Sequence, residues 1–140
     1  VWLWPNVDAG SDDISKALRV FREHKGDSHI KFYRNFSPES YARLISNSSC
    51  IIGNSSSGLR EGAFLGVPCV NIGSRQRNRE RAKNVIDVGH NVDQIERAIC
   101  YQIEHGKYES SHLYGDGKAG QPMSDLLVDC SINIQKTLQY

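Results

Sequence analysis

The sequence predicts an α/β fold, a parallel sheet with flanking helices, in a single domain. Short apolar segments alternate with amphipathic segments along the 140 residues. Such alternation with short connections is typical of parallel sheets joined by right-handed crossovers. Residues 50–52 are wholly apolar, as expected of a strand covered on both faces. Hydrophobic residues make up 39% of the chain and charged residues 24%, which excludes a disordered or collagen-like chain.

The first elements are predicted as strand, helix and strand. Residues 1–4 are apolar and predict a short buried strand. Ser11 can cap a helix that stops at residues 25–27. Residues 29–33 predict the second strand. The apolar residues of the helix recur at i, i+3, i+4 and i+7 and are Ile14, Ala17, Leu18 and Phe21.

The next helix is opened by Ser37 as N-cap and by Pro38 at the first helical position. The strand at residues 50–52 follows, and then a turn at residues 53–58 that is rich in glycine and serine. A helix comes after this turn and is closed by Gly66. The buried residues predicted for these two helices are Tyr41, Leu44 and Ile45 in the first, and Leu59, Ala63 and Phe64 in the second.

Two more strands are predicted at residues 68–72 and 84–88. Asn91 with Gln94 resembles a capping box that opens a helix ending at Gly106. The inward face predicted for this helix is Val92, Ile95, Ile99 and Ile103. Residues 107–121 predict a loop with a tight turn at residues 114–117, and residues 122–139 predict a C-terminal helix.

Composition and charge exclude several classes of protein. The chain has 17 basic and 16 acidic residues, a net charge of +1, so no overall field attracts nucleic acid or anionic lipid. No apolar run approaches the roughly 20 residues of a membrane span. The five histidines show no ligand spacing and accompany no cysteine cluster. We therefore expect no nucleic acid, no membrane, no metal and no cofactor.

The cysteines and the amino-terminal residues indicate a compartment. The four cysteines are far apart and form no CxxC pair. Cys50 and Cys69 lie in apolar runs, which suits buried free thiols. The first residues show no basic region or cleavage-type segment, so we expect no signal peptide. Together these features predict the reducing cytoplasm.

The first candidate site is the turn at residues 53–58 with the start of the following helix. A polar turn after a parallel strand lies at the carboxyl edge of the sheet, where open α/β sheets bind ligands. Gly53 and Gly58 allow a tight turn and the close approach of an anion. Ser55 and Ser56 can add hydroxyl donors, and Glu61 can accept two hydrogen bonds from a ribose diol. The spacing fits a plain connecting turn equally well, and it matches neither the Walker nor the dinucleotide glycine pattern.

The second candidate is the arginine-rich segment at residues 75–83, which carries five basic residues and one acid. It follows the strand at residues 68–72, so it leaves the same sheet edge. Arginine suits bidentate contacts with phosphate, yet composition alone slightly favours a solvated loop. A nucleic-acid patch is disfavoured because no aromatic residues are interleaved. A third polar turn, at residues 6–11, follows the first strand at this edge and is on its own an ordinary helix start.

Six motifs occur in order along the chain and together resemble one family. They are PNVDAGS at residues 5–11, GNSSSGLRE at 53–61, GVPCVNIG at 66–73, RQRNR at 75–79, NV at 84–85 and YGDG at 114–117. This set resembles the carboxyl-terminal part of UDP-N-acetylglucosamine 2-epimerases, especially the hydrolysing type that makes N-acetylmannosamine for sialic acid synthesis. The resemblance covers nearly the whole chain and is most specific at residues 53–85.

The resemblance implies the carboxyl-terminal half of a GT-B-like enzyme with two Rossmann-like domains, incomplete at its N-terminus, with a UDP-sugar in the cleft between the domains. The family reaction eliminates UDP to give a 2-acetamidoglucal and then adds water. The implied acid and base groups belong to the amino-terminal domain, so no catalytic residue is expected here. The implied binding residues are Ser55 and Ser56 for the diphosphate, Glu61 for the ribose, Phe36 and Tyr41 near the uracil, Asn6 near the nucleotide, Arg75 for the phosphates or the sugar, and Gly53, Ser57 and Gly58 in the serine loop.

The sequence departs from the family pattern in two places and in length. Asn78 stands where the family usually has glycine, and Glu61 is followed directly by Gly62. Without the amino-terminal domain, the 140 residues alone are expected to be inactive and to leave apolar surface that favours association between copies. Two alternatives stay open, namely the nucleotide-binding half of a UDP-sugar glycosyltransferase and a UDP-binding module without catalysis.

Overall fold

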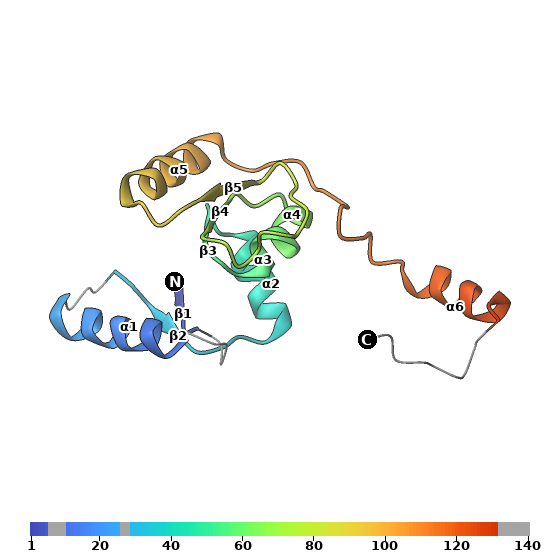
Figure 1. Cartoon of the computed structure of the whole chain (residues 1–140), viewed down its shortest axis with the longest axis horizontal. Helices are drawn as coiled ribbons and strands as arrows, with labels where there is room; N and C mark the ends of the chain where they lie inside the picture. The colour runs from blue at the N-terminus through green and yellow to red at the C-terminus, as the bar shows by residue number, and fades with distance from the viewer. Residues whose placement is uncertain (6–10, 26–28, 132–140) are drawn as a thin grey trace, which may run out of the picture. The chain divides into compact units, whose positions relative to one another are not determined.

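A computed structural model of the chain describes residues 1–5, 11–25 and 29–131 (Figure 1). Its contacts divide the chain into two compact units, Val1–Leu44 and Ile45–Tyr140. Both units are α/β with parallel strands, so the predicted fold class is confirmed. The prediction that residues 1–140 form a single UDP-binding domain stays a prediction.

The first unit is a strand–helix–strand motif. Strand β1 (Trp2–Leu3) pairs in parallel with β2 (Phe32–Tyr33), and helix α1 (Ser11–Lys25) connects them. Aromatic rings pack the helix on the strands, because the centroid of Trp2 lies 6.3 Å from that of Phe21 and 6.0 Å from that of Phe32.

Both strands of the first unit are shorter than the predicted residues 1–4 and 29–33. Only part of the predicted helix face is buried: Leu18 is 3% exposed and Ile14 is 48% exposed. The predicted stop of α1 beyond Lys25 and the side chain of the predicted cap Ser11 lie outside the described structure.

Helix α2 (Pro38–Ser46) begins as predicted. The hydroxyl of Ser37 accepts a hydrogen bond from the backbone N–H of Ser40 at 3.3 Å, which confirms Ser37 as the N-cap. Ile45 is buried, and Tyr41 and Leu44 are half-buried. The predicted stripe of α2 is therefore confirmed with Ile45 as its most buried member.

The second unit holds a three-stranded parallel sheet in the order β3–β4–β5, and Figure 1 shows the three strands side by side. The strands are β3 (Ile51–Gly53), β4 (Cys69–Ile72) and β5 (Val85–Val88). Helix α5 (Val92–His105) packs against β4 and β5, and the short helix α3 (Ser56–Leu59) packs against β4. Leu59, Val67 and Val70 are fully buried and form the centre of this core.

Two predictions about elements of the second unit are wrong in detail. The predicted helix through Leu59 and Phe64 is broken at Arg60 into α3 and α4 (Glu61–Phe64), and Phe64 is largely exposed. The strand at residues 50–52 is not covered on both faces, because the side chain of Ile52 is 50% exposed. Successive side chains of a strand point to opposite faces, and only the face of the neighbouring Ile51 is packed.

Helix α5 has the predicted ends but a different buried face. The side chain of Asn91 accepts the N–H of Gln94 at 3.0 Å, and Gly106 ends the helix with φ +73°. The predicted inward residues Val92 and Ile103 are 74% and 54% exposed. Ile95 and Ile99 are half-buried. The residues that are actually buried along this helix are Ala98 and Gln102.

After α5 the chain runs without regular structure to helix α6 (Gly120–Asp129). Residues 132–139 of the predicted C-terminal helix lie outside the described part of the chain. The connecting segment is fixed by backbone bonds, since the N–H of Tyr108 donates to the carbonyl of Gly66 and that of Ser111 to the carbonyl of Ala63. Among the described residues, no helix has both the length and the apolar character needed to cross a bilayer.

Candidate nucleotide-binding site

The serine loop, residues 53–58, starts at the carboxyl end of β3. Gly53 ends the strand with φ +138°, a conformation that favours glycine. The chain then passes to Ser55, which has an extended backbone and caps α3. The hydroxyl of Ser55 accepts the N–H of Ser57 at 3.3 Å and lies 3.2 Å from the hydroxyl of Ser57. Three serine side chains are thereby gathered at one turn, with Ser55 exposed and Ser56 half-buried.

Gly58 has a packing role that the sequence did not indicate. A Cβ atom at this position would overlap the Sγ atom of Cys69 on β4. The absence of a side chain therefore lets α3 approach the sheet. Cys69 is 2% exposed, and burial raises the pKa of its thiol to about 12, so the thiol stays protonated. An anion contact at Gly58 stays a prediction.

The arginine loop, residues 75–81, is tied to the serine loop. The guanidinium of Arg75 donates to the carbonyl oxygen of Asn54 at 3.2 Å, and the side-chain amide of Gln76 donates to the same oxygen at 2.8 Å. Gln76 is 3% exposed, so this contact is well shielded from water. The two loops predicted to share a sheet edge are thus joined through one carbonyl.

Arg81 anchors the other end of the arginine loop. Its guanidinium forms two bonds with Asp87, Nε to Oδ2 at 2.8 Å and Nη2 to Oδ1 at 3.2 Å, and Nη1 donates to the carbonyl of Gln76 at 2.7 Å. The side chain of Asn71 donates to Asp87 at 2.6 Å. The hydrogen bond from Arg81, aided by that from Asn71, lowers the pKa of Asp87.

A buried amide network connects the serine loop to the sheet. Asn84 is 2% exposed and donates to the carbonyl oxygens of Gly58 at 3.1 Å and Val67 at 2.8 Å. Gln102 is fully buried and donates to the carbonyl oxygens of Cys69 and Asn84, each at 2.9 Å. Pattern analysis missed the roles of Gln76, Asn84 and Gln102, because the sequence does not show which carbonyl oxygen a polar side chain will bond. The available signal was the position of Gln76 and Asn84 inside family motifs, and Gln102 lies in none of them.

The other predicted site residues are placed as follows. Glu61 is the first residue of α4 and is exposed. Phe36 and Tyr41 belong to the first unit, where the ring of Phe36 lies 4.8 Å from that of Tyr33. Asn6 lies outside the described residues. The second unit thus brings together one set of predicted residues: Gly53, Ser55, Ser56, Ser57, Gly58 and Arg75.

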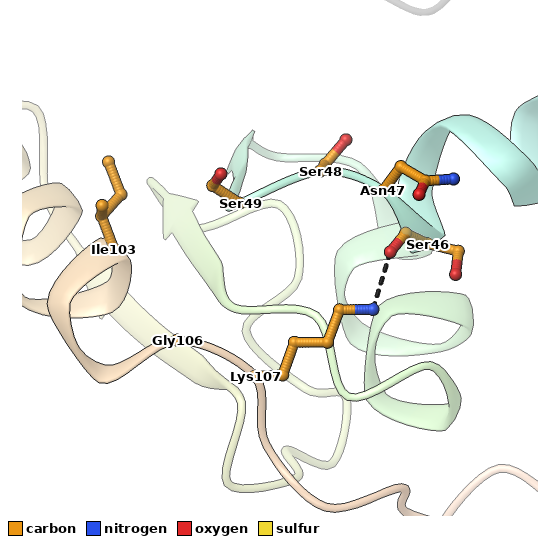
Figure 2. A pocket seen from close by; sticks show the side chains of 7 residues that line it. All are labelled: Ser46, Asn47, Ser48, Ser49, Ile103, Gly106 and Lys107. Carbon is orange, nitrogen blue, oxygen red and sulfur yellow. Dashed lines mark hydrogen bonds between the residues drawn. The ribbon is translucent and has the colours of Figure 1, made fainter.

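A polar pocket of about 390 Å³ lies elsewhere in the second unit (Figure 2). The ammonium group of Lys107 donates to the carbonyl of Ser46, the last residue of α2, at 2.7 Å. A cation at a helix C-terminus is stabilising. None of the predicted binding residues lines this pocket, which is formed by Ser46, Asn47, Ser48, Ser49, Ile103, Gly106 and Lys107.

No group of three potential metal ligands from His, Cys, Asp and Glu occurs within residues 1–5, 11–25 and 29–131. The groups gathered at the carboxyl edge are instead hydroxyl and guanidinium donors. Parallel strands with polar loops at this edge define an α/β protein of the kind that binds ligands at the carboxyl ends of its strands.

Sequence comparison gives the family within this class. The UDP-N-acetylglucosamine 2-epimerase family model matches residues 1–128. The chain therefore belongs to the UDP-N-acetylglucosamine 2-epimerase family, and the resemblance indicated by its motifs is confirmed.

Three curated relatives share this similarity. A UDP-N,N'-diacetylbacillosamine 2-epimerase (hydrolyzing) of Legionella pneumophila is 35% identical over 96% of this chain. A UDP-N-acetylglucosamine 2-epimerase of Neisseria meningitidis serogroup B is 30% identical over 82% of it. A GDP/UDP-N,N'-diacetylbacillosamine 2-epimerase (hydrolyzing) of Campylobacter jejuni is 41% identical over 59% of it. The matches cover 35%, 29% and 21% of these relatives, so the chain spans about a third of their length or less.

Proposed function

We propose that the chain is the UDP-binding half of a hydrolysing UDP-sugar 2-epimerase that converts UDP-N-acetylglucosamine to N-acetylmannosamine and UDP. The observation that carries this proposal is the serine loop at the end of β3, joined to Arg75 and Gln76 through the carbonyl of Asn54. The proposed compartment is the cytoplasm. Association between copies of the chain stays a prediction.

The proposed mechanism uses these residues to hold the leaving group. In the elimination step the bond between the sugar C1 and the diphosphate oxygen breaks, a proton leaves C2, and UDP departs with the electron pair. Hydroxyl donors of Ser55 and Ser56 and the charge of Arg75 stabilise the negative charge that develops on the diphosphate. Water then adds to the 2-acetamidoglucal. The groups that move these protons are proposed to lie outside residues 1–140.

The nucleoside is proposed to bind beside the loop. The carboxylate of Glu61 accepts hydrogen bonds from the two ribose hydroxyls, and a role of Phe36 and Tyr41 near the uracil stays a prediction from the family resemblance. A carboxylate matched to a diol favours a ribonucleotide, because bonds to charged groups contribute about 1.5–3 kcal/mol each. The serine loop and Arg75 then supply the affinity for the diphosphate.

The test is calorimetric titration of the 140-residue chain and its variants with UDP. Ser55→Asp keeps an N-cap acceptor for α3 but places a carboxylate against the diphosphate, so UDP binding should be lost while thermal stability is retained. Glu61→Ala should weaken binding by about 1.5–3 kcal/mol. Arg97→Gln, an exposed change on α5, serves as the control. Unchanged UDP affinity in Ser55→Asp would contradict the proposal.

A second substrate is supported by the names of two relatives. The relatives from Legionella pneumophila and Campylobacter jejuni are named for UDP-N,N'-diacetylbacillosamine, and the first aligns with 96% of this chain. We therefore propose a UDP-linked diacetamido sugar as the alternative substrate. Measuring UDP release from both UDP-sugars by the longer protein that contains these residues distinguishes the two. The 140-residue chain alone should release UDP from neither.

A further inference from the structure

A hollow of about 590 Å³, which we name the arginine basin, lies at the carboxyl ends of β4 and β5. No residue of the range 53–61 lines it, so it is distinct from the serine loop. Its lining residues end or follow the two strands or belong to the arginine loop: Gly73, Ser74, Arg77, Arg79, Arg81, Asp87, Val88, Gly89 and His90.

Backbone pairing and a close glycine–imidazole approach join the strand ends that line the basin. The N–H of Gly73 donates to the carbonyl of Val88 at 2.8 Å, so the hydrogen-bond ladder continues one residue past β4. Gly73 has φ +81°, and a Cβ atom there would lie 3.0 Å from Nε2 of His90. The imidazole therefore packs directly against the glycine, and any side chain at position 73 would displace it.

The wall of the basin carries positive charge in excess. Asp87 is its one acidic group, and that charge is matched by Arg81 through two hydrogen bonds. The exposed guanidinium groups of Arg77 and Arg79 have no hydrogen-bond or ion-pair partner in the described part of the chain. Backbone bonds from Arg77 to Ser74 at 3.0 Å and from Arg79 to Gln76 at 3.1 Å fix the turns that carry them.

We propose that the arginine basin binds an oxyanion group, a phosphate or carboxylate of a small ligand, at a site separate from the serine loop. Two guanidinium groups bind such anions through paired N–H donors. The hydroxyl of Ser74 and the ring of His90 add donors at the same surface. The volume of the basin is that of small-molecule sites. The proposal does not rest on UDP binding, because it uses none of the residues assigned to UDP.

The test follows backbone amide signals of the 140-residue chain by NMR during titration with sodium phosphate, with and without saturating UDP. The signals of Gly73, Gly89 and His90 should shift in both series. Titration with sodium citrate at equal ionic strength distinguishes a phosphate from a carboxylate ligand. If UDP fails to bind, the proposed function is contradicted. The phosphate titration without UDP still tests whether the arginine basin binds an anion.

Variants identify the groups responsible. Arg77→Gln and Arg79→Gln should each weaken anion binding about tenfold, whereas Ser55→Asp and the control Arg97→Gln should leave it unchanged. Arg77→Lys keeps the charge but loses the paired donors, so its affinity should fall between that of the parent chain and that of the Arg77→Gln variant. Unshifted signals of Ala98 and Gln102 show that each variant is folded. Equal affinity in Arg77→Gln, Arg79→Gln and Arg97→Gln, or shifts confined to residues 55–57, would overturn the proposal.

Discussion

Single residues decide how closely the elements of the second unit approach one another. Gly58 is the clearest example, because its missing side chain makes room for the buried thiol of Cys69. A sequence shows such a glycine only as part of a turn. Its packing partner lies 11 positions along the chain, on a strand that must first be placed in the sheet.

Gly58→Ala should destabilise the fold, because the new methyl group overlaps Cys69 Sγ. Overpacking of this kind costs about 1–3 kcal/mol. Urea unfolding measures the change, with Gly120→Ala as control because no atom lies within 4 Å of a Cβ built at Gly120. The double variant Gly58→Ala with Cys69→Ala should lose less stability than the sum of the single variants. Strict additivity would contradict the proposed clash.

Residues whose role is local were predicted correctly. Ser37 and Asn91 cap their helices, and Gly66 and Gly106 end theirs with positive φ. These roles depend on bonds within three or four positions, so a short stretch of sequence contains the whole interaction. The contact of Arg75 with Asn54 spans 21 positions. The sequence predicted only that the two loops share a sheet edge. The strand order brings the loops together but does not determine which hydrogen bonds form between them.

At the scale of the elements, α5 shows why the ends of a helix are easier to predict than its buried face. Hydrophobic spacing favoured the stripe through Val92 and Ile103. The helix instead turns Ala98 and Gln102 inward, since a small residue permits close approach and the amide meets two carbonyl oxygens. A pattern that treats glutamine as exposed places this helix face incorrectly.

Substitutions on the two faces of α5 should therefore lower the free energy of unfolding in the opposite order to the one that the hydrophobic pattern predicts. The change at Gln102 should cost more than the change at Val92. Gln102→Leu removes the donor to the carbonyls of Cys69 and Asn84 and the acceptor for the hydroxyl of Tyr108. Each buried group left without its partner costs about 1–3 kcal/mol. Val92→Ser should change the free energy of unfolding by less than about 0.5 kcal/mol. Urea unfolding measures the free energy of unfolding of both variants. A larger loss of stability in Val92→Ser than in Gln102→Leu would show that the hydrophobic pattern had identified the buried face correctly.

For the whole molecule, stability in acid should respond to Asp87. Asp87 forms a salt bridge with Arg81, whose Nε lies 2.8 Å from Oδ2 of the carboxylate. The lowered pKa of Asp87 means that folding favours its ionised form. Its contribution is complete above the unfolded pKa near 4 and is lost as the pH falls through the lower folded value.

Urea midpoints measured from pH 6 down to pH 2 test this expectation. The parent chain should lose stability over the acid part of this range, and Arg81→Gln should lose less of it, because its Asp87 no longer gains from a guanidinium. Arg97→Gln should follow the parent. Parallel curves for the parent and Arg81→Gln would mean that the pair is too well solvated to matter.

The segment between α5 and α6 connects regions that are distant in sequence. The hydroxyl of Ser110 donates to the carbonyl of Phe64 at 2.6 Å, and that of Tyr114 donates to the carbonyl of Glu80 at 2.7 Å. A shortened polypeptide ending at Gly106 would retain every strand of the β3–β5 sheet and still lose the support of α4 and of the arginine-rich segment. The carboxyl-terminal boundary of a minimal ligand-binding fragment therefore falls beyond Tyr114, not at the last helix that packs on the sheet.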